Sequence, residues 1–111
     1  MIKETDIIGT VNDLKPNEYS ASLAKFVREL DLRIRKEIFG EKEPVYDASA
    51  LVLNEPESEI YVLYLFAVID FLNCEFGKYE CSLGEFKNAY KRLEAHAVEN
   101  KSLCERKFKI W

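Results

Sequence analysis

Few residues of this chain are of types that carry out chemistry, and their spacing favours no reaction. The single histidine, His96, has no cysteine or second histidine near it at the spacing of metal ligands. Glu55, Glu57 and Glu59 form an acidic cluster, but carboxylates at a helix start usually stabilise the positive end of the helix dipole. We therefore expect His96 to be an ordinary surface or boundary residue and the glutamates to support a helix N-terminus.

Asp70 is the one charged residue in the apolar run IYVLYLFAVIDFL at 60–72. A carboxylate in such a run must be paired, capped or placed at the helix exit, so we expect a structural ion pair rather than a catalytic role. The basic residues Arg33, Arg35 and Lys36 are followed by Glu37, which is typical of a solvated helix face. The sequence has no Gly-rich phosphate loop or nucleophile elbow, so we predict no enzyme, no catalytic residue, no cofactor and no metal.

Length and composition predict one small globular domain. The chain has 111 residues, of which 48% are hydrophobic and 32% charged. Its longest uncharged apolar run, Ile60–Ile69, is too short to cross a bilayer, and the N-terminus lacks a signal-peptide pattern. An odd cysteine count (Cys74, Cys81, Cys104) argues against a disulfide framework and favours reduced thiols that act as small apolar residues in the cytoplasm.

Hydrophobic periodicity predicts an all-α domain of four helices, at about 5–14, 20–39, 56–73 and 82–99. The third is apolar all round, which indicates a central helix on which the others pack. Its residues Leu65, Phe66 and Ile69 are expected to be buried. Ser82 and Glu85 have the spacing of a capping box, so we predict that the last helix begins at Ser82.

Two segments lie outside this pattern. Residues 40–57 form a long connection that we expect to be mobile in the free protein, and residues 50–53 within it predict either a short strand or an extended segment on the core. Residues 101–111 are expected to form an extended tail after a helical domain at 1–100. The tail mixes cations with apolar residues of a kind found at binding hot spots, so we predict that it docks on a partner, the alternative being that it packs back on its own domain. The candidate partner-binding residues are Arg106, Lys107, Phe108, Lys109, Ile110 and Trp111.

The charge balance bears on nucleic acids. Acidic residues number 20 and basic residues 16, so the net charge is -4. A protein with this balance has no broad electrostatic attraction to DNA phosphates.

Three stretches in this order resemble a known family. They are NDLKPNEYS at 12–20, ELDLRIRKEIF at 29–39 and the long run at 51–90. Within the long run, the matching steps are Glu55-Pro56, Ile60-Tyr61, Tyr64-Leu65, Ile69-Asp70-Phe71, Asn73-Cys74-Glu75-Phe76, Tyr79-Glu80-Cys81-Ser82 and Phe86-Lys87-Asn88-Ala89-Tyr90. The chain resembles, over about residues 10–95, the head–tail connector (adaptor) proteins of tailed phages and prophages of Gram-positive bacteria.

Three steps of the family pattern differ in this chain. Cys74 stands where the family has a turn glycine, Glu80-Cys81 replaces Asn-Asn, and Phe26-Val27 replaces Trp-Leu. The matching steps are core and turn patterns, so a function inferred from them rests on family analogy.

The resemblance implies a virion structural role. Subunits of the family are small and helical, and they form a ring, with the twelve-fold symmetry of the portal, that extends the DNA channel beneath it. The implied partners are the portal, neighbouring copies and the next neck or tail-completion protein, with DNA passing through unbound and no membrane involved. The implied location is the virion neck, after assembly from the host cytoplasm. The alternative is a small phage regulatory module, such as an anti-repressor or antitoxin-like binder.

Overall fold

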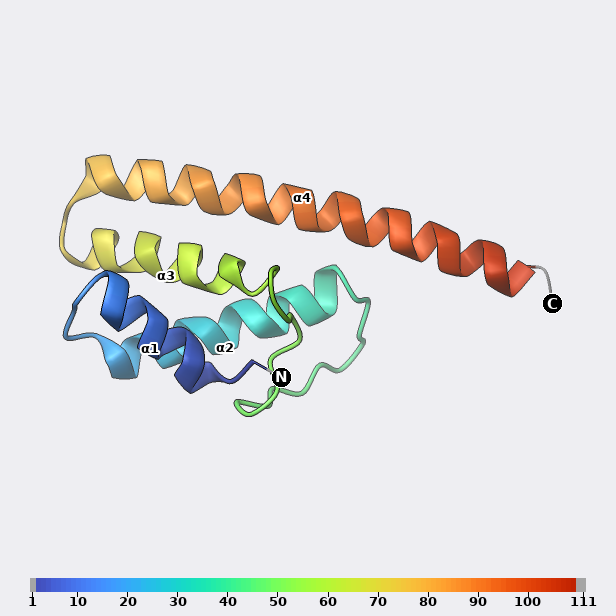
Figure 1. The fold of residues 1–111 in the computed structure, drawn as a ribbon, viewed down its shortest axis with the longest axis horizontal. Helices are drawn as coiled ribbons and strands as arrows, with labels where there is room; N and C mark the ends of the chain where they lie inside the picture. The colour runs from blue at the N-terminus through green and yellow to red at the C-terminus, as the bar shows by residue number, and fades with distance from the viewer. Residues whose placement is uncertain (1, 110–111) are drawn as a thin grey trace.

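The computed structural model describes the backbone of residues 2–109 and the side chains of residues 2–96. Its four helices are α1 (Glu4–Leu14), α2 (Ser20–Glu37), α3 (Glu59–Leu72) and α4 (Phe76–Lys109). The predicted all-α class is confirmed, and the described residues contain no strand. Figure 1 shows α3 between α4 on one side and the pair α1 and α2 on the other.

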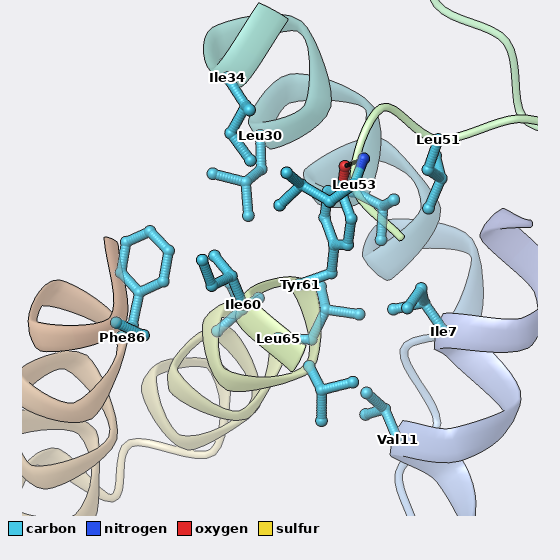
Figure 2. Packing of buried hydrophobic residues seen from close by; sticks show 14 of the residues in the cluster. Ile7, Val11, Leu30, Ile34, Leu51, Leu53, Ile60, Tyr61, Leu65 and Phe86 are labelled. Atoms are coloured by element: carbon cyan, nitrogen blue, oxygen red, sulfur yellow. Dashed lines mark hydrogen bonds between the residues drawn. The ribbon is translucent and has the colours of Figure 1, made fainter. Parts of the chain in front are cut away.

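Helix α3 is the centre of the fold, as its all-round apolar sequence predicts. It packs against α1, α2 and α4. Tyr61, Leu65 and Ile69 are completely buried, whereas Phe66 is only partly buried. Figure 2 shows Tyr61 and Leu65 facing side chains from α1, from α2 and from the segment before α3. Burial of this set contributes to the hydrophobic stabilisation, because each fully buried large apolar side chain contributes about 1.5–3 kcal/mol.

The long connection between α2 and α3 is fastened to the core in its second half. Gly40 closes α2 in the left-handed region, with φ 68°, which glycine adopts without strain. Residues 51–53 form neither a helix nor a strand, and Leu51 and Leu53 are buried. The Leu51 N–H donates to the carbonyl of Ile2 at 2.9 Å. This segment therefore lies against the core through Leu51 and Leu53.

Helix α3 ends in a Schellman turn. The N–H of Glu75 donates to the Asp70 carbonyl at 2.9 Å, and the N–H of Cys74 donates to the Phe71 carbonyl at 3.0 Å. Such a turn requires a left-handed residue at its centre, and Cys74 takes this position with φ 59°. The apolar run thus stops after Leu72 because the backbone reverses there.

The predicted start of α4 at Ser82 is wrong. The helix begins at Phe76, and the Ser82 hydroxyl donates to Asp70 Oδ2 at 2.8 Å instead of capping a helix. Local sequence cannot distinguish these two uses of a serine, because the acceptor lies on another helix. Phe76 and Tyr79 are accordingly part of α4 and stack on Phe71, with ring centroids 6.0 and 5.3 Å away.

Helix α4 also extends further than predicted, since its backbone is helical through Lys109. The extended tail expected from residue 101 is thus helical over 101–109. With 34 residues, α4 is far longer than the 14-residue α3 on which it packs. Figure 1 shows its C-terminal part projecting beyond the other helices, and the molecule measures 53 × 28 × 22 Å.

Candidate protein-interaction surfaces

Asp70 forms the structural ion pair that the sequence predicts. Its carboxylate is completely buried at the end of α3, and it accepts hydrogen bonds from Lys15 Nζ and from the Ser82 hydroxyl. Lys15 also lies over the ring of Phe66, 5.6 Å from its centroid. The three groups join α1, α3 and α4 at one end of the bundle, which gives Asp70 a structural task.

A second buried carboxylate, Asp31, was missed by the sequence analysis. Asp31 Oδ1 accepts hydrogen bonds from the Tyr61 hydroxyl at 2.7 Å and from the Val52 N–H at 2.9 Å. Its Oδ2 accepts from Arg35 Nε at 2.8 Å, and Arg35 also donates to the Ala50 carbonyl. The signal that points to this residue is its position on the buried face of α2, between Val27 and Ile34.

The Asp31 cluster fixes the protonation of its partners. Burial and then the hydrogen bond to Asp31 raise the pKa of the Tyr61 hydroxyl well above its usual value. The hydrogen bond to Asp31 also raises the pKa of Arg35. Among the described residues, no buried side-chain nitrogen or oxygen lacks a hydrogen-bond partner. Through the hydrogen bonds to Ala50 and Val52, the cluster ties the 50–53 segment to α2 and α3.

Two basic residues of α2, Arg33 and Arg35, are engaged within the chain. Arg33 donates to Glu37 at 3.1 Å and lies over the ring of Tyr90, 5.0 Å from its centroid. Tyr90 in turn donates to Glu37 at 2.8 Å. Arg35 is held by Asp31, as described above, so Arg33 and Arg35 do not form an open basic patch with Lys36.

His96 and the acidic cluster come together at an open groove. A cavity of about 390 Å³ lies between the N-terminal end of α3 and α4, where Glu57 and Glu59 face Arg92 and His96. His96 itself is exposed, as expected. In the part of the chain with described side chains, no three His, Cys, Asp or Glu residues come together in a way that could hold a metal ion.

A second cavity, of about 410 Å³, adjoins the first on the α1 side of α3. The two cavities share Pro56, Glu59 and Leu63, so they form one groove that we call the α1–α4 groove. Its walls are mainly apolar, with Ile7 and Leu14 on α1, Phe66 on α3 and Ala89 and Leu93 on α4.

The α3–α4 turn carries an exposed aromatic patch. Phe71 is 53% exposed, Phe76 is 55% exposed and Leu72 is 38% exposed. The Phe71 ring contacts the Phe76 ring in a T-shaped arrangement and the Tyr79 ring in a tilted one. Cys74 and Cys81 are free thiols, as the cysteine count predicts, and both are exposed in the same region. Exposed aromatic groups of this kind mark a candidate contact with another protein.

Four of the predicted partner-binding residues, 106–109, belong to the last turn of α4. The backbone of 106–109 is helical, but the side chains of Arg106, Lys107, Phe108 and Lys109, together with Ile110 and Trp111, lie outside the described residues. No described helix is long and apolar enough to cross a membrane.

The structure thus offers three candidate contact regions, which are the α1–α4 groove, the aromatic patch and the projecting part of α4. Comparison with protein-family models, with curated protein sequences and with solved structures gives no match.

Proposed function

We propose that this chain is a head–tail connector subunit of a tailed phage or prophage. In this role, copies of the chain form a ring beneath the portal, extend the DNA channel and offer a platform for the next neck protein. The subunit is located in the virion neck after assembly from the host cytoplasm.

One observation carries most of the proposal. Cys74 stands where the connector family has a turn glycine, and its φ of 59° is the left-handed conformation that glycine favours. Any Schellman turn needs a left-handed residue at this position, so the backbone here is compatible with the glycine of the family pattern. Tyr61, Asp70 and Tyr90, which belong to the matching steps, are also buried and hydrogen-bonded, as family core positions should be.

Charge and shape support the same role. A net charge of -4 disfavours adhesion of DNA to the channel wall. A body of short helices with one projecting helix gives each subunit two separated regions for contact, so a subunit can hold its neighbour and the portal at once. The basic and aromatic residues at 106–111 supply the docking chemistry.

The test is a mass measurement of the purified protein, alone and mixed with the portal protein encoded in the same gene cluster. We expect a complex in which about one copy is bound per portal subunit. Absence of binding to the portal at micromolar concentrations contradicts the proposal. A small complex with a repressor or a toxin would instead identify the chain as a regulatory binder.

A further inference from the structure

The α1–α4 groove has the geometry of a site for one more helix. Helices α1 and α4 both pack on α3, and within the described residues their backbones do not come close to each other. The outer face of α3 is therefore left open between them. Glu59, Leu63 and Phe66 lie along this face at helical spacing and are not fully buried. An amphipathic helix laid in such a groove buries its apolar face while its polar face stays in water.

The rim of the groove is acidic. Asp6, Glu55, Glu57 and Glu59 line it, against the single guanidinium of Arg92. The groove therefore favours an occupant that combines apolar and cationic residues.

The chain itself contains a segment of that composition. Residues 101–111 carry Lys101, Arg106, Lys107 and Lys109 against one Glu105, interspersed with Leu103, Phe108, Ile110 and Trp111. The backbone of this segment continues α4 without a break through Lys109. It projects away from the body that holds the groove, so a chain cannot place this segment in its own groove without breaking α4 (Figure 1).

We propose that the α1–α4 groove of one subunit binds residues 101–111 of a second copy. Each copy then gives one segment and accepts another, which is a heterologous contact that builds rings or filaments rather than a closed two-fold dimer. This inference rests on the proposed function, since it assigns the docking segment of the connector to the neighbouring subunit and not to the portal.

Two full-length variants separate the two halves of the contact. Leu63→Glu places a charge in the apolar centre of the groove, and Phe108→Glu with Trp111→Glu removes the apolar groups of the segment. Val45→Glu is the control, because Val45 is 76% exposed and lies outside the groove. Analytical ultracentrifugation over a concentration series measures the mass, and circular dichroism confirms that each variant is folded.

We expect the wild type and Val45→Glu to associate as concentration rises, and each test variant alone to associate at least ten-fold more weakly. An equimolar mixture of the two variants should form a complex of two chains, because it contains one intact groove and one intact segment. Raising the salt concentration should weaken that complex. If Leu63→Glu proves unfolded, Glu59→Lys at the exposed rim replaces it, with the same expected loss.

A wild type that stays monomeric at millimolar concentration overturns the inference. So does a folded groove variant that associates like the wild type, or a mixture that contains only single chains. A different result would contradict the proposed connector function, namely that the chain does not bind the portal. The two failures are therefore distinguishable, since one is measured on the chain alone and the other on its mixture with the portal.

Discussion

Lys15 forms an ion pair with Asp70, a residue 55 positions later in the chain. Lys15 follows the last residue of α1, and its side chain is 29% exposed, whereas the Asp70 carboxylate is completely buried. The pair therefore couples the end of α1 to the last turn of α3, next to the Schellman turn that leads into α4.

Replacing Lys15 with methionine should destabilise the protein by about 3 kcal/mol, since it leaves a buried carboxylate without its cation. The matched control is Lys78→Met, because Lys78 pairs with Glu75 on the surface and should contribute less than about 1 kcal/mol. Urea unfolding measures both. Adding Asp70→Asn to Lys15→Met should cost less than the sum of the single changes, and strict additivity would show that the two residues are not coupled.

Leu65 tests the central position of α3. It is completely buried, so Leu65→Ala should lower the free energy of unfolding by roughly 2–5 kcal/mol. The control is Leu72→Ala on the same helix, which should cost much less because Leu72 is 38% exposed. Equal losses for the two variants in a denaturant melt would contradict the assignment of α3 as the buried centre.

Cys74 tests the turn between α3 and α4. Its φ of 59° strains any residue with a Cβ, and a left-handed conformation costs about 1–2 kcal/mol outside glycine. Cys74→Gly should relieve this strain and, after the entropy that glycine adds to the unfolded chain, raise the melting temperature by a few degrees. Cys74→Val should lower it. A lower melting temperature for the glycine variant would sink this interpretation of the turn.

The contact between Glu37 and Tyr90 should make the free energy of unfolding depend on pH in the acidic range. The hydrogen bond from Tyr90, followed by the one from Arg33, lowers the pKa of Glu37 below its usual value of 4.5. A carboxylate with a lowered folded pKa adds stability that is present above its unfolded pKa and is lost as pH falls through the folded pKa. Burial and the same hydrogen bond raise the pKa of Tyr90 to about 12, so its hydroxyl remains a donor throughout this range.

Tyr90→Phe removes the hydrogen bond that is the larger cause of the lowered pKa of Glu37. The difference in stability between wild type and Tyr90→Phe should therefore be larger at pH 7 than at pH 3. Chemical denaturation at the two pH values measures it. Parallel pH profiles for the two proteins would mean that Tyr90 does not act through Glu37.

The 40–57 connection should exchange its amide hydrogens unevenly. The N–H groups of Leu51, Val52 and Leu53 donate to Ile2, to Asp31 and to the Tyr61 hydroxyl respectively. We expect these three amides to be protected in the free protein, while residues 42–45 exchange fast and gain protection only if a partner covers them. Fast exchange throughout 42–53 would contradict the observed fastening of this segment.

The sequence by itself determined the all-α class, the approximate positions of α1, α2 and α3, and the central place of α3. The helix positions follow from local periodicity. The central place of α3 follows from the lack of a polar face at 60–69, because a helix that is apolar on all sides is stable in water only when other elements surround it. The structural pairing of Asp70 also follows from the sequence, because a charge in such a run must find a partner. The identity of that partner does not follow, since Lys15 is remote in the chain.

Only the tertiary structure decided where α4 begins and what Ser82 does. The pattern Ser82–Glu85 satisfies a local capping rule. In the structure, however, the Ser82 hydroxyl on α4 donates its hydrogen bond to Asp70 on α3. The same holds for Asp31, whose partners on α3 and in the 50–53 segment become visible only when the helices are packed. The α1–α4 groove likewise exists only because α1 and α4 pack on α3 while their backbones do not come close to each other within the described residues. Local sequence encodes helix propensity, whereas side-chain partners and open faces depend on how those helices are packed in space.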